Sequence, residues 1–276
     1  MRKLCRAGFM LLFAATVSFS LYGQNNFFAE SKEPGISITA GKRVIIPEVY
    51  RTVTLNHAGM ESFLKSLPSE TGLVNKGMAP VIELPMPDGG ISKYRIWESP
   101  VMETLLAARF PGIKTFTGQG IDDPTATIKI DLTESGFHAM VLSDITGNIF
   151  IDPYSQLETK HYNVYFKKDF KNKDPFIEHG VIPSSKTQKF TPNRPLAGPC
   201  MGAELRTYRL AVACTGEYAR AATGLPNPTV AQALSAIVTS INRVDGIYEK
   251  ELAISLNLVA NNNLVVFVDP GTDPRF

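Results

Sequence analysis

One apolar stripe in the last quarter of the chain constrains the fold most strongly. Its members recur at separations of three, four or one positions over about six helical turns, which places them on one face of a long helix: Val230, Leu234, Ile237, Val238, Ile241, Val244 and Tyr248. Asn227 can cap the start of this helix, with Pro228 in its first turn. Short apolar segments at 210–213, 254–258 and 264–268 predict the order strand, long helix, strand, strand.

The region from residue 36 to residue 170 has a different pattern. Short segments of alternating polarity are separated by Gly, Pro and Asp, which is typical of half-buried antiparallel strands. The sequence Asp88-Gly89-Gly90 predicts a hairpin. The expected elements are strands at 43–47, 81–87, 92–97, 126–132 and 137–141, and helices at 58–66 and 100–110. We therefore predict an α+β fold, in which a strand-rich domain precedes a layer that combines a long helix with strands.

The first 23 residues have the order of a secretory signal peptide. Basic residues precede an apolar run at 9–17, and small residues follow it. We expect cleavage before Gln24, with cleavage after Ser20 as the alternative, and a protein that is secreted or held at the cell surface. The apolar run is too short to cross a bilayer, which needs about 20 apolar residues.

The charge balance argues against nucleic acid as a partner. The 276 residues include 28 Lys and Arg against 26 Asp and Glu. Without the signal residues Arg2, Lys3 and Arg6, 25 basic residues remain against 26 acidic ones. A near-neutral chain with no basic stripe lacks the electrostatic footprint of a nucleic-acid-binding protein. No later segment is apolar enough to suggest a membrane partner.

These patterns divide the chain into five parts. They are the signal peptide 1–23, a polar and flexible leader 24–35, a first domain 36–170, an exposed linker 171–199 rich in Lys, Pro and Ser, and a second unit 200–276. The second unit has a long helix and too few strands to cover it. We therefore expect that this sequence holds only the opening part of a second domain.

The residues alone show no assembled active site. The four histidines, His57, His138, His161 and His179, are scattered, and no HExxH segment occurs. The pair Asp122 and Asp123 could bind calcium or form an entry turn into the next strand, and the turn is the simpler interpretation.

Several sequence blocks nevertheless resemble one family. They are 47–51, 84–89, 98–102, 118–124 and 151–155 in the first domain, and 205–218, 241–244, 248–249 and 258–262 in the second unit. In this order they resemble the precursors of bacterial reprolysin-like zinc metalloproteases, a branch of the metzincins. The first domain would be the propeptide, and residues 200–276 would be the N-terminal start of the catalytic domain.

The resemblance implies a secreted zinc endopeptidase that acts on proteins or peptides. In that family three histidines of an HExxHxxGxxH segment hold zinc, and the glutamate activates the bound water. This sequence ends before such a segment, so we assign no catalytic residue and no certain zinc ligand in it. We expect zinc in the full-length enzyme only, and an inactive chain without its own missing catalytic portion. The propeptide would assist folding and keep the zymogen latent.

Cys200 is the one candidate site residue. At the junction of linker and second unit, its thiolate could bind the catalytic zinc as a latch. A disulfide with Cys214, or with a cysteine beyond this sequence, is the alternative that an exported protein favours. Activation between Lys186 and Arg194 would leave Cys200 on the mature enzyme and could not release a latch, whereas cleavage near Arg206 could.

A second hypothesis comes from a different class. The chain could be an exported non-enzymatic module, derived from the propeptide, that binds or inhibits a separate protease. Cooperative folding of residues 200–276 alone would favour this hypothesis, since a half-built sheet should not be stable. A reading frame that continues into HExxH would favour the protease.

Overall fold

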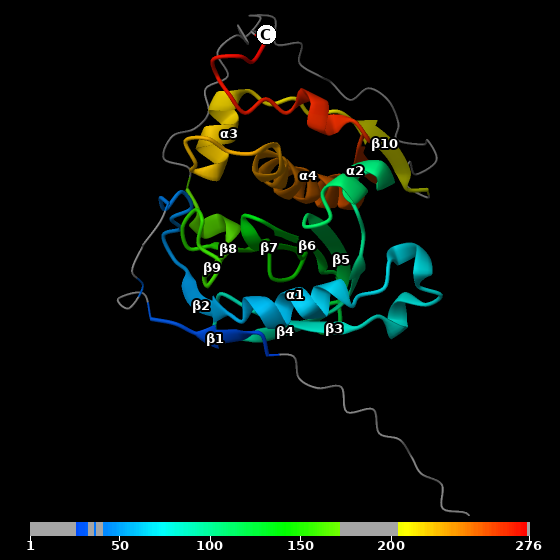
Figure 1. Ribbon diagram of the computed structural model, residues 1–276. Helices are drawn as coiled ribbons and strands as arrows, with labels where there is room; N and C mark the ends of the chain where they lie inside the picture. Colours follow the sequence, from blue (N-terminus) through cyan, green and yellow to red (C-terminus); the bar gives the residue numbers. More distant parts are fainter. Residues whose placement is uncertain (1–25, 33–35, 37–40, 172–203, 275–276) are drawn as a thin grey trace, which may run out of the picture.

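The computed structural model of the protein describes residues 26–32, 36, 41–171 and 204–274 (Figure 1). The predicted signal peptide and all but the first residue of the predicted linker lie outside these ranges, so both stay predictions. A nine-stranded sheet is followed by a helical unit that carries a two-stranded sheet. This mixture of helices and strands confirms the α+β class. Within the described ranges, no helix has both the length and the apolar character needed to cross a membrane.

The large sheet is antiparallel throughout and is built mainly from strands that follow one another in the chain. In spatial order it contains β1 (Phe28–Glu30), β2 (Arg51–Leu55), β9 (His161–Phe166), β8 (Ile149–Pro153), β7 (Gly136–Leu142), β6 (Thr127–Thr133), β5 (Lys114–Gly120), β4 (Ile91–Glu98) and β3 (Val81–Pro85). The sheet curls so that its two ends approach each other. Arg51 on β2, near one end, donates hydrogen bonds to the carbonyls of Met86 and Gly90, beside β3 at the other end.

The predicted hairpin joins β3 to β4. Gly89 at its tip has a φ of +98°, in the left-handed region that glycine enters without steric cost, and its N–H donates to the Met86 carbonyl. Short 3-10 turns complete this domain at η2 (Glu70–Gly72), η3 (Lys76–Met78) and η4 (Lys167–Asp169).

The inner face of the curled sheet is the main apolar core. Large side chains such as Phe116, Ile130 and Tyr162 are fully buried there. α1 (His57–Lys65), predicted at 58–66, adds Met60 and Leu64 to the same cluster. Alternation along the strands therefore predicted this face correctly.

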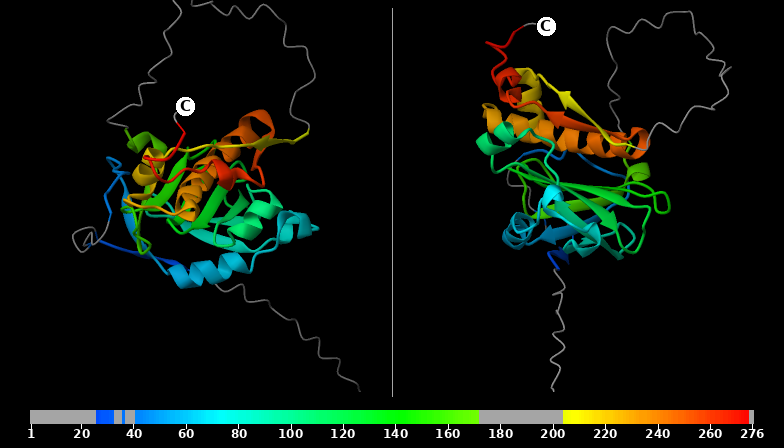
Figure 2. Two further views of the ribbon diagram at one scale, coloured as in Figure 1. Left: turned by 45° about the horizontal axis from the view of Figure 1, so that its top comes forward. Right: turned by 90° about the vertical axis from the view of Figure 1, so that its right-hand side faces the viewer.

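The outer face of the sheet is covered by α4 (Val230–Leu252), which packs over β6 and β7 (Figures 1 and 2). Thr229, rather than the predicted Asn227, caps this helix. Its hydroxyl accepts from the Gln232 N–H while the Gln232 side chain accepts from the Thr229 N–H, a reciprocal capping box. The prediction that the strands are only half-buried is wrong here, because the outward-facing Lys129 and Asp131 lie buried.

On its other side, α4 carries the small parallel sheet of β10 (Arg206–Leu210) and β11 (Ile254–Leu258), with α3 (Gly216–Thr223) beside it. The right-hand view of Figure 2 shows α4 between the large sheet and β10. A second apolar cluster fills this layer. It combines second-unit residues such as Leu234 and Leu258 with Met102 and Leu106 of the first domain.

Two predictions near the N-terminus are wrong. Residues 43–47 form no strand, since Pro47 has no N–H to donate and Val44 is 63% exposed. The leader 24–35 is not entirely loose, because Phe28–Glu30 pairs with β2 as β1. The Phe28 ring anchors it, with its centroid 5.8 Å from that of Phe137.

Three further predictions differ at their boundaries. The helix expected at 100–110 is shortened to α2 (Thr104–Arg109), because 101–103 are extended against β11. The strand expected at 210–213 is β10 at 206–210, whose exposed polar side chains gave no apolar pattern. The strand expected at 264–268 is replaced by the 3-10 turn η5 (Asn262–Val265), with only an isolated bridge between Cys214 and Val266.

Candidate functional site

The contact between the outer face of the large sheet and α4 contains a buried ionic cluster. Lys129 Nζ on β6 lies 2.8 Å from Asp245 Oδ2 and 2.7 Å from Glu249 Oε2, both on α4. Lys129 and Asp245 are 5% and 2% exposed. Burial raises the pKa of Glu249; Lys129 opposes this shift, and the neighbouring Asp245 carboxylate adds to it. One cation therefore serves two acids.

A second buried pair joins β8 to α4. The fully buried Asp152 accepts from the Arg243 guanidinium and, at 2.7 Å, from the Tyr165 hydroxyl. Burial by itself would raise the pKa of Asp152, but the attraction of Arg243 and His138 and the two hydrogen bonds outweigh it and hold the pKa below its ordinary value. Asp152 is thus kept ionised only by its partners.

A third set of contacts joins β6 and β7 to the same helix. Asp131 on β6 accepts from the Thr239 hydroxyl of α4 at 2.7 Å, and His138 Nδ1 lies 2.9 Å from the same carboxylate oxygen. Asn242 donates to the Ile130 carbonyl at 3.0 Å. Polar groups of α4 thus meet polar groups of the sheet along much of the helix.

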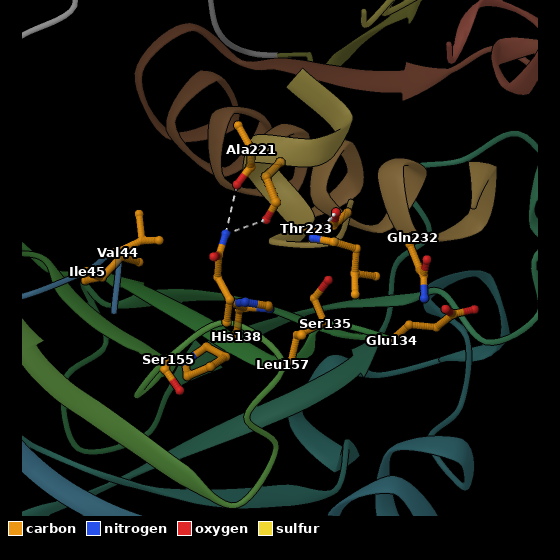
Figure 3. A pocket seen from close by; sticks show the side chains of 14 residues that line it. Val44, Ile45, Glu134, Ser135, His138, Ser155, Leu157, Ala221, Thr223 and Gln232 are labelled. Carbon is orange, nitrogen blue, oxygen red and sulfur yellow. Dashed lines mark hydrogen bonds between the residues drawn. The ribbon is translucent and has the colours of Figure 1, made fainter. Parts of the chain in front are cut away.

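Two cavities flank this contact. Figure 3 shows one of about 220 Å³, lined by His138, Ser135 and Leu157 from the sheet side and by α3. Gln156 bridges it by donating to the Ala221 and Ala222 carbonyls at 2.8 and 3.3 Å.

The other cavity, of about 520 Å³, lies beside Lys129 and includes Trp97. The buried Trp97 Nε1 has no hydrogen-bond partner among the described residues. The contact is therefore polar and is bordered by cavities. Interfaces between separable domains have this character.

The described residues provide no zinc site. Within the described ranges, no group of three or more His, Cys, Asp or Glu side chains is arranged to hold a metal. His57 lies at the start of α1, His138 pairs with Asp131, and His161 Nδ1 is 3.6 Å from Glu158 Oε2. His179 lies outside the described residues.

The aspartates Asp122 and Asp123 serve a turn, as expected. Asp122 accepts from the Lys93 N–H at 2.9 Å. Asp123 accepts from the N–H and hydroxyl of Thr125 and from the Ser143 hydroxyl. Their carboxylates are committed to hydrogen bonds within the protein.

Of the two cysteines near the second unit, the structure describes Cys214. Cys200 lies outside the described residues, so both the zinc latch and its disulfide alternatives stay predictions. Cys214 is buried, and its Sγ lies 3.6 Å from the Phe267 carbonyl oxygen. Burial raises the pKa of Cys214, which disfavours the reactive thiolate.

Asp152, Arg243 and Glu249 lie in blocks that carry the family resemblance, but no contact between the two units was predicted for them. Lys129 and Asp245 lie in none of these blocks. A pattern that could have found them is a second stripe on α4, formed by Asn242, Asp245, Gly246 and Glu249 at helical spacing. It runs beside the apolar stripe and is buried or half-buried along its length. Polar residues in such a stripe indicate a buried polar surface opposite them.

With this geometry in view, the chain is an α+β protein whose C-terminal unit consists of a strand, two helices and a second strand. Residues 204–275 match the family model described as Metallo-peptidase family M12B Reprolysin-like. This match covers the second unit and supports a metalloprotease. No curated protein and no solved structure gives a significant match to the chain.

Proposed function

We propose that this sequence is the N-terminal portion of the precursor of an exported zinc metalloendopeptidase. Residues 1–23 would be its signal peptide, 36–170 its propeptide and 200–276 the beginning of its catalytic domain. The observation that carries the proposal is the family match over 204–275. Proteins or peptides would be the substrates of the complete enzyme.

The contact between α4 and the large sheet supports a propeptide role for the first domain. Its ion pairs and hydrogen bonds link the sheet of the first domain to a helix of the second unit. Surfaces that must later separate carry polar groups that water can solvate again, and the α4 face has them, while Met102 and Leu106 add a smaller apolar part to the interface. The first domain would therefore hold the catalytic part during folding and leave it after cleavage in the linker.

Zinc enters this proposal only as the cofactor of the complete enzyme. The described residues do not fit a zinc site, so no catalytic step is assigned to any of them. The family match also gives no support to a stand-alone inhibitory module, because the matched model describes a metallopeptidase family.

The test is to express the complete reading frame that contains this sequence. We expect bound zinc by elemental analysis and hydrolysis of a protein substrate that a chelator abolishes and added zinc restores. Adding residues 24–171 in trans to the processed enzyme should reduce the rate. A complete protein that neither binds zinc nor cleaves substrates after removal of its first domain would overturn the proposal.

A further inference from the structure

The outer edge of β11 is satisfied by groups from elsewhere in the chain. β11 uses one edge to pair with β10. On the other edge, the Leu256 N–H donates to Asp245 Oδ1 at 2.6 Å, and the Leu258 N–H donates to the Val101 carbonyl at 2.8 Å. The Leu258 carbonyl accepts from the Glu103 N–H at 2.9 Å. The first domain therefore contributes one strand-like contact to a sheet of the second unit.

Residues 101–109, which we call the clamp, continue this contact with side chains. Glu103 Oε2 accepts from the Ala260 N–H at 2.8 Å, and the Arg109 guanidinium lies 3.4 Å from the Ala260 carbonyl oxygen. Both backbone groups of Ala260 are thus held by the clamp. The Arg209 guanidinium of β10 also donates to Glu103 at 2.5 Å. These hydrogen bonds from Arg209 and Ala260 lower the pKa of Glu103, so its carboxylate stays charged.

The apolar side of the clamp is buried in the second unit. Val101, Met102 and Leu106 belong to the cluster that also contains Leu234 and Leu258. Leu106 is fully buried. The clamp therefore fits the β11 edge in two ways. Its extended part, with two apolar residues and Glu103, pairs with the backbone of the edge, and Leu106 in the following helical turn fills the apolar cluster.

A groove extends the same edge beyond the clamp. A cavity of about 810 Å³ lies between the two units, with Ser255, Leu256 and Asn257 of β11 on one wall and first-domain residues such as Glu70 and Ser99 on the other. Withdrawal of the first domain would expose the β11 wall of this groove together with the edge groups of Leu258 and Ala260. Exposed strand edges readily take up a further strand, and backbone pairing of this kind is a recurrent mode of peptide recognition.

We propose that the outer edge of β11 is a peptide-binding site, which the clamp occupies in the intact chain and which opens when the two units separate. Its ligand is an extended peptide with the clamp's pattern of two apolar residues, Glu and a following helical turn. The inference rests on the separation of the units in the proposed function, but it concerns a site that contains no zinc and no catalytic group.

The first test uses the full chain and a fluorescent peptide of residues 99–112. In the wild type the clamp is tethered beside its site at a millimolar effective concentration and should exclude the peptide. In a Glu103→Pro, Leu106→Ala variant, residue 103 loses the N–H that donates to the Leu258 carbonyl and the carboxylate that accepts from Ala260. Residue 106 loses most of its buried side chain. Proline suits the φ of −58° at residue 103, so the backbone there should be unstrained. We expect this variant to bind the peptide at least ten-fold more tightly than the wild type does.

Two controls make the test specific. An Ile145→Ala chain changes an exposed residue outside the clamp and should behave as the wild type. A peptide that carries the Glu103→Pro change should not bind any chain. Binding of both peptides alike, or binding of neither to a folded variant, would overturn the proposal.

Hydrogen exchange provides a test that does not depend on the double variant. In a Glu103→Ala chain, the Ala260 amide should exchange at least ten-fold faster than in the wild type, while the Leu258 amide stays protected by the Val101 carbonyl. Unchanged exchange at Ala260 would overturn the role of Glu103. Neither measurement uses zinc or proteolysis, so failure here leaves the metallopeptidase proposal intact, and an inactive full-length protein would leave peptide binding intact.

Discussion

Lys129 on the large sheet and Asp245 on α4 form an ion pair of 2.8 Å although they are 116 residues apart in the chain and both are nearly inaccessible to solvent. Charges are costly to bury, and such a pair persists only when each partner neutralises the other. The pair therefore ties the position of α4 to the outer face of the sheet.

Replacing Lys129 by Met should destabilise the chain strongly. It leaves Asp245 and Glu249 buried beside each other without a cation, and loss of one partner of a buried ion pair costs about 3–5 kcal/mol. Urea unfolding at pH 7 measures this free energy. The further changes Asp245→Asn and Glu249→Gln remove the unpaired charges and should recover part of the loss.

The matched control for this variant is Lys65→Met. Lys65 pairs with Glu61 on the surface of α1, where the two side chains are 61% and 41% exposed. Surface pairs contribute about 0–1 kcal/mol. A Lys129→Met chain that loses no more stability than Lys65→Met would contradict the role given to the buried cluster.

Glu249 should make stability fall as pH rises. Because its pKa is raised in the folded chain, its protonated form is favoured there. Its contribution is complete below the unfolded-state pKa and is lost as pH rises through the folded pKa. Between these two pKa values, the free energy of unfolding can fall by about 1.4 kcal/mol per pH unit. Urea unfolding between pH 4 and 8 should show a flatter profile for Glu249→Gln, and Glu251→Gln, an exposed change on the same helix, should keep the wild-type slope.

Arg243→Met should act at the opposite end of the pH range. Asp152 has a lowered pKa, so its contribution is present above the unfolded-state pKa and is lost as pH falls through the folded one. Without Arg243, the buried carboxylate loses its cation, at a cost of about 3–5 kcal/mol in the free energy of unfolding at pH 7. Because Arg243 no longer lowers the pKa of Asp152, the variant should lose less further stability than the wild type as the pH falls.

A second change tests whether that cost comes from the charge of Asp152. Asp152→Asn in the Arg243→Met background keeps an acceptor for Tyr165 and should restore part of the stability at pH 7. If the double variant is as unstable as Arg243→Met alone, packing rather than charge explains the loss.

Sequence patterns predicted the elements well where neighbouring residues alone determine the strand, turn or helix. The alternation at 126–132 gave β6, the Gly-containing turn gave the hairpin between β3 and β4, and the apolar stripe gave α4. The same alternation could not show that Lys129 is buried. The polar face of a strand looks the same in sequence whether water or a distant helix covers it.

The clamp shows the same limit. Met102 and Leu106 have helical spacing, which predicted a helix from residue 100, yet residues 101–103 are extended because Leu258 offers them backbone partners. That partner lies more than 150 positions away in the chain. Cys200, the one candidate that the sequence named, lies outside the described residues and stays untested.

Gly246 sets how closely α4 approaches the sheet. A Cβ atom there would lie 2.7 Å from Lys129 Cγ and 3.1 Å from Met140 Cε, which is too close without movement. At an exposed helical position, Gly→Ala stabilises by about 1 kcal/mol because alanine has the higher helix propensity. Here the added methyl must displace the stem of Lys129 and lengthen its contacts with Asp245 and Glu249, and such overpacking costs about 1–3 kcal/mol.

We therefore expect Gly246→Ala to lower the thermal unfolding temperature and Gly246→Leu to lower it further. The control is Val244→Ala, an exposed change on the same helix, which should have little effect or raise the unfolding temperature slightly. Hydrogen exchange should also become faster along α4 and β6 in the Gly246 variants, because the contact between these elements loosens. A Gly246→Ala chain more stable than the wild type would mean that helix propensity outweighs the contact, and that α4 can move from the sheet without disturbing the buried ion pairs.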